Sequence, residues 1–202
     1  MITISKEKLQ ILCQYIDLNN PKYELDYLFT SDGYLMATDT RAAIRMKADY
    51  TEDIWLHRNV VNVALSVKGA VKFNLSNKSI ECLDKKDNSI VAINDTNNER
   101  ELRNTINLNK VFPKSFKKKI NFTCKSQTNG IFALNGVNIS EKYIPKKLPN
   151  SFKGVIAIND YNLPVLIRGV KSEDIYENTL DDIEILIMPI VDNYLIDATQ
   201  AS

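Results

Sequence analysis

The first 95 residues of the chain alternate between short apolar runs and helical spacing. The opening "ITIS" (residues 2–5) alternates as a strand does, and Ser5 then stands where an N-cap belongs, before a helix predicted over residues 6–17. The apolar positions of that helix fall on one face: Leu9, Leu12, Cys13 and Ile16. The pattern predicts a short strand that leads directly into an amphipathic helix.

A hairpin is predicted next. Two apolar arms, "YLFT" and "YLMAT", flank residues 31–33, where Gly33 follows Asp32 and can take the positive φ of a tight turn. We interpret residues 34–47 as one strand that begins apolar and ends in charged side chains. Those charged residues are Asp39, Arg41, Arg45 and Lys47.

A second strand and helix follow the hairpin. "DIWLH" reads as a strand, and "RNVVNVALSVKG" predicts a helix that starts at Arg58 and stops at Gly69. Its apolar face comprises Val60, Val61, Ala64 and Leu65. Three alternating runs, at residues 70–77, 78–84 and 88–95, then predict a β-meander.

The polar stretch "NDTNNERELRN" predicts a boundary between two units, residues 1–97 and 98–191, with a tail at 192–202. The second unit repeats features of the first, because "TSDGYLMATD" is answered by "QTNGIFALNG" and "DIWLHRNVVNVAL" by "GVIAINDYNLPVL". We expect an α+β fold of two duplicated units, each with an antiparallel sheet and about two helices. The alternative is that two hairpins resemble each other through their Asp-Gly and Asn-Gly turns alone.

Composition narrows the function classes. The chain is 44% hydrophobic and 25% charged, with a net charge of +1, so any affinity for nucleic acid depends on where its 26 basic residues lie. Its three cysteines follow no metal-ligand spacing, and no catalytic or phosphate-cradling motif is present. We expect a cytoplasmic protein that is not an enzyme, binds no cofactor or metal, and has no membrane contact.

Three strings, in this order, carry a resemblance to a known family. "ATDTRAAI" (residues 37–44) resembles the "ATDGHRLA" strand end of the bacterial DNA sliding clamp, the processivity ring of replicative DNA polymerase. "VFPK" (111–114) resembles the "VLPK" that joins the clamp's middle and last domains, and "ILIMPI" (185–190) is similar to its terminal "VVMPM". The resemblance covers residues 1 to about 191 as the middle and last domains of a three-domain family.

The resemblance implies a ring around duplex DNA that recruits polymerase or repair proteins through short peptides. Two units per chain imply a homotrimer, because six such units close the family's ring. The implied peptide pocket comprises Thr40, Arg41, Ala42, Ala43, Val111, Met188, Pro189 and Ile190. Ala43 stands where the family has leucine.

A sliding ring needs inward positive charge without base recognition. The implied DNA-binding residues are Lys6, Lys8, Arg58, Lys114, Lys117, Lys118, Lys119 and Arg168, with the lysine run at the start of the second unit and Arg168 at the end of its last helix. Each also fits a plainer role: the run "KSFKKK" fits a solvated turn, and a lysine on a helix usually faces water.

Other interpretations stay open at this point. Asp39 and Arg41 fit a surface ion pair, and Met188 and Pro189 fit ordinary core and edge-strand positions. A rival function is a clamp-like interaction module, of phage or mobile-element origin, that does not encircle DNA. For the tail 192–202, three roles stay open under the resemblance: it covers the pocket, extends a strand or trails from the domain.

Overall fold

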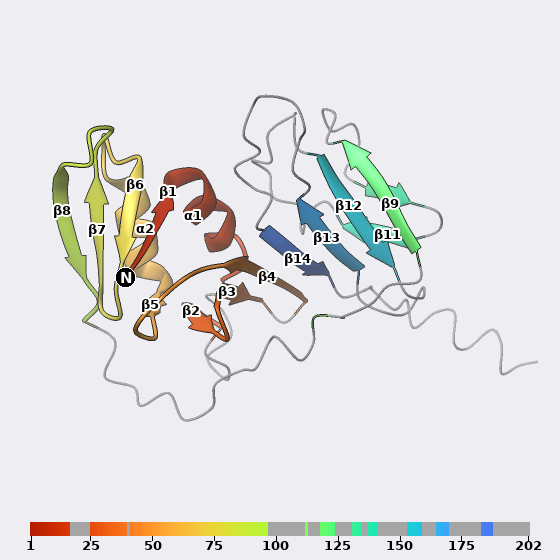
Figure 1. Cartoon of the computed structure of the whole chain (residues 1–202), viewed down its shortest axis with the longest axis horizontal. Coiled ribbons are helices and arrows are strands. Elements are labelled where there is room, and N and C mark those ends of the chain that lie inside the picture. Colours follow the sequence, from red (N-terminus) through yellow and green to blue (C-terminus); the bar gives the residue numbers. More distant parts are fainter. Residues whose placement is uncertain are drawn as a thin grey trace, which may run out of the picture.

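One long sheet of eight strands joins the strands from the first part of the chain to strands that follow residue 118 (Figure 1). The computed structural model describes residues 1–16, 25–39, 41–96, 112, 118–123, 131–134, 137–140, 153–158, 165–169 and 183–187. We call residues 1–96 the first unit and the strands from residue 118 onward the second unit. The boundary predicted at residues 97 and 98 lies outside the described residues.

The first unit consists of two halves with the same order of elements, a strand, a helix and three strands. The first half contains β1 (Ile2–Ser5), α1 (Lys6–Cys13), β2 (Tyr27–Ser31), β3 (Tyr34–Thr38) and β4 (Ala42–Lys47). The second half contains β5 (Trp55–His57), α2 (Arg58–Ser66), β6 (Lys72–Leu75), β7 (Ser79–Leu83) and β8 (Ser89–Asn94). The first strand of each half pairs with a strand of the other half: β1 pairs with β6, and β5 pairs with β2.

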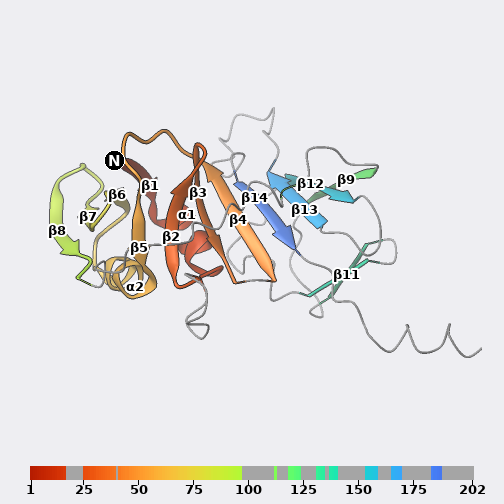
Figure 2. The ribbon, with the colours of Figure 1, turned by 90° about the horizontal axis from the view of Figure 1, so that it is seen from below.

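The second unit extends one of these sheets. Its described strands are β9 (Lys118–Thr123), β10 (Ile131–Leu134), β11 (Val137–Ser140), β12 (Lys153–Ile158), β13 (Val165–Gly169) and β14 (Ile183–Ile187). The eight-stranded sheet runs β5-β2-β3-β4-β14-β13-β12-β9, the four-stranded sheet runs β1-β6-β7-β8, and β10 pairs with β11. Both views place β14 beside β4, where Ala43 faces Leu186 across an antiparallel pair (Figure 2).

The main core lies between the two sheets of the first unit, and the two helices fill it. In α1, Leu9, Ile11 and Leu12 are fully buried, and in α2 the buried residues are Val60, Val61 and Ala64. Ser5 caps α1 as predicted, because its Oγ accepts a hydrogen bond from the backbone N–H of Lys8 at 3.3 Å. The α+β class and the strand and helix order predicted for residues 1–16 and 53–95 are confirmed.

The predicted hairpin turn forms at Asp32 and Gly33, with φ angles of 48° and 82°. Two successive positive φ angles are what a tight two-residue hairpin turn requires. The single strand predicted over residues 34–47 is wrong, because the chain reverses after Thr38 and returns as β4. Asp39 causes the reversal: its Oδ1 accepts from the backbone N–H groups of Arg41 at 3.0 Å and Ala42 at 2.8 Å.

The helix expected to end at Arg168 is also wrong, because residues 165–169 form β13 between β12 and β14. The run Val165, Leu166, Ile167 lies between Pro164 and Gly169 in the sequence, and such a short apolar run suits a buried strand. The other helix expected in the second unit, near the lysine run, lies outside the described residues, except that Lys118 and Lys119 begin β9.

Candidate functional site

The strand end predicted as part of a pocket lies at the joint between the two units. Ala42 and Ala43 begin β4, directly beside Ile187 and Leu186 of β14. Because side chains alternate along a strand, the two alanines face opposite ways: Ala42 packs in the main core, and Ala43 packs on the outer face of the sheet. Arg41 precedes them and is exposed.

The outer face of the eight-stranded sheet carries a second apolar cluster, which we call the outer cluster. Its members are Tyr27, Phe29, Met36, Ala43, Trp55, Phe112, Leu166 and Leu186, with Tyr34 partly buried against them. Phe29 stacks on Trp55 at a centroid distance of 4.9 Å and an interplanar angle of 13°. The outer cluster spans both units, because β2, β3, β4 and β5 supply one part and β13 and β14 supply the other.

Arg45 holds this joint together. Its Nε and Nη2 atoms lie 2.6 Å and 2.5 Å from Glu184 Oε2 on β14. The guanidinium also lies between two rings, 4.4 Å from the centroid of Tyr34 and 4.1 Å from that of Phe112. The side chains of Arg45 and Glu184 are only 12% and 17% exposed, so water screens this ion pair weakly.

The structure therefore gathers Ala43, Leu186 and Phe112 into one cluster around the predicted pocket position. Thr40, Val111, Met188, Pro189 and Ile190 lie outside the described residues. Sequence reasoning did not assign Leu186, Phe112, Arg45 or Glu184 to the pocket, although Leu186 and Phe112 lie within the quoted strings "ILIMPI" and "VFPK". The alternation of "IEILI" (183–187) was the available signal, since it places Glu184 and Leu186 on one face.

Apart from Arg58, the residues predicted to bind DNA fall into three groups by their place in the chain. Lys6 and Lys8 lie in the first turn of α1, where both are half-buried. Lys118, Lys119 and Arg168 lie on strands β9 and β13, while Lys114 and Lys117 are outside the described residues.

Arg58 occupies a structural position at the start of α2. Its Nη1 donates to the backbone carbonyl of Ile16, and its Nε is buried without a hydrogen-bond partner among the described residues. Nearby, the Cys13 thiol donates to Asn62 Oδ1 at 3.3 Å, and burial raises the pKa of that thiol while Arg58 opposes the shift. Arg58 thus ties the end of α1 to the start of α2.

His57 is the N-cap of α2. Its Nδ1 accepts from the backbone N–H of Asn59 at 3.2 Å, and its Nε2 lies 3.2 Å from Asp26 Oδ2. Its backbone N–H donates to the buried Asp95 at 2.8 Å. With these contacts, His57 caps the N-terminus of α2.

Within the described part of the chain, no group of three or more His, Cys, Asp or Glu residues is placed to hold a metal ion, and no helix is long and apolar enough to cross a membrane. A shallow groove of about 380 Å³ lies between β1 and residues 46–49, away from the outer cluster.

By sequence, no family model and no curated protein matches the chain. Solved structures do. The Helicobacter pylori β clamp in complex with carprofen superimposes with a TM-score of 0.60 at 15% identity, covering 94% of this chain and 66% of the clamp. The same clamp bound to a DNA ligase peptide gives 0.59 at 14%, with 94% and 65% covered.

A clamp from a second organism gives the same result. The Pseudomonas aeruginosa DnaN sliding clamp bound to griselimycin has a TM-score of 0.58 at 12% identity, covering 93% of this chain and 64% of that one. The chain thus spans slightly less than two thirds of the length of the clamps it matches. With two sheets and two helices in the first unit, and a second unit joined strand to strand, the chain has the fold of the bacterial β sliding clamps.

Proposed function

We propose that this protein is a sliding-clamp-like platform that encircles duplex DNA and recruits partner proteins through short peptides, without catalysing a reaction. The observation that carries the proposal is the pairing of β4 with β14, which joins two units into one sheet by their edges. A ring of sheets needs this kind of joint, repeated between chains.

The free strand β8 supports closure of such a ring. β14 is the last described strand of the second unit and joins the first unit, whereas β8 is the last described strand of the first unit and, among the described residues, pairs only with β7. Ile90 and Val91 on β8 are 43% and 41% exposed, which is unusual for an edge strand left in water. If both last strands serve the same role, β8 joins the second unit of a neighbouring chain, and three chains close the circle.

The outer cluster supports the recruitment of peptides. Ala43, Leu186 and Phe112 are buried together at the joint and would form the base of a pocket there, and exposed Arg41 precedes Ala43, where it can meet carbonyl or acidic groups. The Helicobacter pylori clamp has been solved with a DNA ligase peptide. That peptide is therefore a suitable first probe for this protein.

Molar mass in solution tests the ring. Light scattering at two protein and two salt concentrations should give three times the chain mass of 23.0 kDa. Val91→Lys should shift the protein to monomer, because a lysine on an edge strand opposes strand pairing. The matched control is Val63→Lys, since Val63 is 53% exposed on α2 and lies on no sheet edge.

A wild-type protein that stays at 23.0 kDa under all conditions would rule out the closed ring. It would favour the interaction module that does not encircle DNA. Binding of the DNA ligase peptide to that monomer would then be the remaining test of recruitment.

A further inference from the structure

Four segments of the first unit meet at one end of the four-stranded sheet. Ser5, which caps α1, pairs with Lys72 at the start of β6, and Lys72 pairs with Leu83 at the end of β7. The backbone N–H of Lys6 donates to Val71 at 2.9 Å, and that of Val71 donates to Leu83 at 2.9 Å. The loop after α2 reaches the same region, where Gly69 approaches Ile90 of β8. The turn from β7 to β8 therefore lies beside the start of α1 and the end of α2.

Lysines are concentrated at this end. They come from the start of α1, the loop after α2, the start of β6 and the β7–β8 turn: Lys6, Lys68, Lys72, Lys85 and Lys86. Lys68, Lys85 and Lys86 are exposed. We call these three residues the lysine tip.

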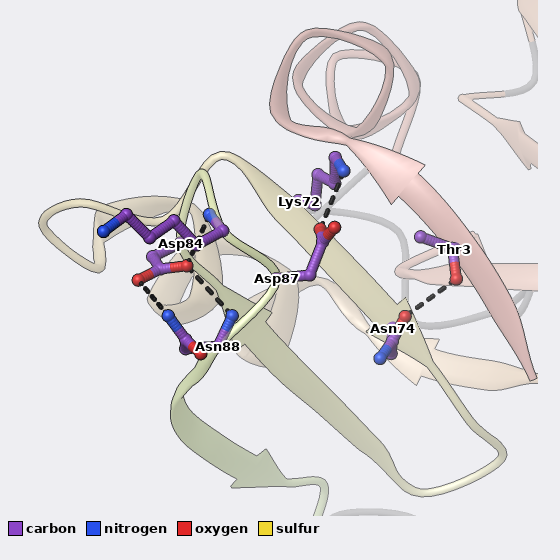
Figure 3. A network of polar contacts seen from close by, with 7 residues as sticks. Thr3, Lys72, Asn74, Asp84, Asp87 and Asn88 are labelled. Carbon is purple, nitrogen blue, oxygen red and sulfur yellow. Dashed lines mark hydrogen bonds and ion pairs between the residues drawn. The ribbon is translucent and has the colours of Figure 1, made fainter.

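The acidic residues of the turn are occupied by internal contacts (Figure 3). Asp84 accepts hydrogen bonds from the backbone N–H groups of Lys86 at 2.7 Å and Asn88 at 2.9 Å, and from Asn88 Nδ2 at 3.0 Å. These bonds lower the pKa of the Asp84 carboxyl, with the Asn88 side chain contributing most. Asp87 lies 2.7 Å from the Nζ of Lys72. The carboxylates of the turn therefore hold the loop together, while Lys85 and Lys86 stay in water.

The turn also has a defined backbone. Asp87 has a φ of 63°, a left-handed conformation that aspartate tolerates better than most residues. The backbone N–H of Asp84 donates to Asn88 at 3.0 Å, and that of Asp87 donates to Asp84 at 3.2 Å. Because the loop is already ordered, less conformational entropy is lost when a ligand binds there.

We propose that the lysine tip binds the phosphate backbone of duplex DNA, a contact that the sequence did not predict. Lysine ammonium groups act as point charges toward phosphate, and they lack the planar fork with which arginine reads guanine. Contacts of this kind add affinity without sequence preference, as a sliding platform needs. The inference rests on the proposed function, because it assigns part of the DNA contact to an end of the unit.

Fluorescence anisotropy with a short labelled duplex, over a series of salt concentrations, tests the lysine tip. Lys85→Gln/Lys86→Gln should weaken binding about tenfold at low salt and reduce the slope of log K against log salt by about 2, since each phosphate contact contributes about 0.9 to that slope. Lys68→Gln, on a different segment, should reduce the slope by about 1. The matched control is Lys78→Gln, because Lys78 is an exposed lysine in the turn at the opposite end of the same sheet.

Three outcomes separate the inference from the proposed function. Equal affinity and equal salt slope for wild type and the double variant overturn the lysine tip and leave the platform standing. No binding of duplex by wild type at low salt overturns both. If Lys78→Gln loses as much affinity for the duplex as the double variant, the loss is an effect of net charge, and this result also overturns the lysine tip as a binding site. Thermal unfolding of each variant checks that the fold is retained, and Lys68→Gln supplies an independent test if the turn variant unfolds.

Discussion

The two sheets of the first unit are built from the same order of elements, but their outer faces are opposite in character. On the four-stranded sheet, Thr3 Oγ1 donates to Asn74 Oδ1 at 2.8 Å (Figure 3). Asn74 Nδ2 in turn donates to Glu81 Oε2 at 2.9 Å. On the eight-stranded sheet the equivalent face carries the aromatic outer cluster. The two sheets have corresponding sets of first-unit strands, β1-β6-β7-β8 and β5-β2-β3-β4, so the side chains of the outer face decide which sheet has a polar face and which carries a buried apolar cluster.

The largest expected effect comes from the aromatic face. Phe29→Ala should destabilise the protein by about 3–5 kcal/mol, because Phe29 is almost fully buried and its loss leaves a cavity beside Trp55. Asn74→Ala, the corresponding change on the polar face, should cost about 1 kcal/mol. Urea unfolding of both variants measures the difference, and equal losses would remove the contrast between the two faces.

The second-largest loss of stability is expected at the joint between β4 and β14. Glu184→Gln should destabilise the protein by about 2 kcal/mol, because the Arg45 guanidinium is mostly buried and would lose its charged partner. Arg45→Met/Glu184→Leu should recover part of this loss, since neither charge is then buried alone. A double-mutant cycle by chemical unfolding, with Arg45→Met and Glu184→Leu as its single variants, gives the coupling, and fully additive losses would show that the ion pair does not join the units.

A smaller effect is expected on peptide binding. Arg41→Glu should weaken binding of the DNA ligase peptide about fivefold with little change in stability, because Arg41 is exposed beside the outer cluster. Lys47→Glu is the control, an exposed basic residue at the other end of β4. Fluorescence polarisation with labelled peptide measures both, and an equal response of the two variants would argue against a pocket near Arg41.

The smallest effect concerns acid pH and the polar face. The folded pKa of Asp84 lies below its ordinary value of 3.8, and that of Glu81 lies below 4.5, mainly because of their hydrogen bonds to Asn88 and Asn74. A carboxyl group whose pKa is lower in the folded state stabilises the fold at pH values above its ordinary pKa. This contribution disappears as the pH falls through the folded-state pKa. Amide exchange at Lys86 and Asn88 should therefore accelerate below about pH 4, relative to the outer cluster strands. Asp84→Asn should flatten this dependence, and an unchanged profile would contradict the role of Asp84 in the turn.

Local signals in the sequence predicted the first unit well. Ser5 and the Asp32-Gly33 turn act on their immediate neighbours, so a short window contains all the information needed. The reversal at Asp39 was missed because "ATDTRAAI" contains no glycine or proline, and the turn depends on one carboxylate accepting two backbone N–H groups. The strand β13 was missed because a short apolar run fits a helix or a strand until its partners are known.

The site was predictable only where the family motifs pointed to it. Ala43 was named from its motif, whereas Arg45 and Glu184 pair across 139 residues of sequence, a contact that no local pattern encodes. The full pocket and the ring stay predictions. The lysine tip was missed because the same lysines in the sequence lie among aspartates, and only the structure shows that Asp84 bonds within the turn and Asp87 pairs with Lys72 of β6.

The pairing of β4 with β14 has a consequence for synthesis of the protein in the cell. Residues 42–47 leave the ribosome long before their partner strand, residues 183–187, because Arg45 precedes Glu184 by 139 residues. The nascent first unit therefore carries a bare β4 edge until that strand has been made, and bare edges pair readily with other chains. Ribosomes that follow one another on the same message would hold several such edges close together. Slow translation between residues 96 and 183 should thus lower the soluble yield, and co-expressed chaperones should restore it.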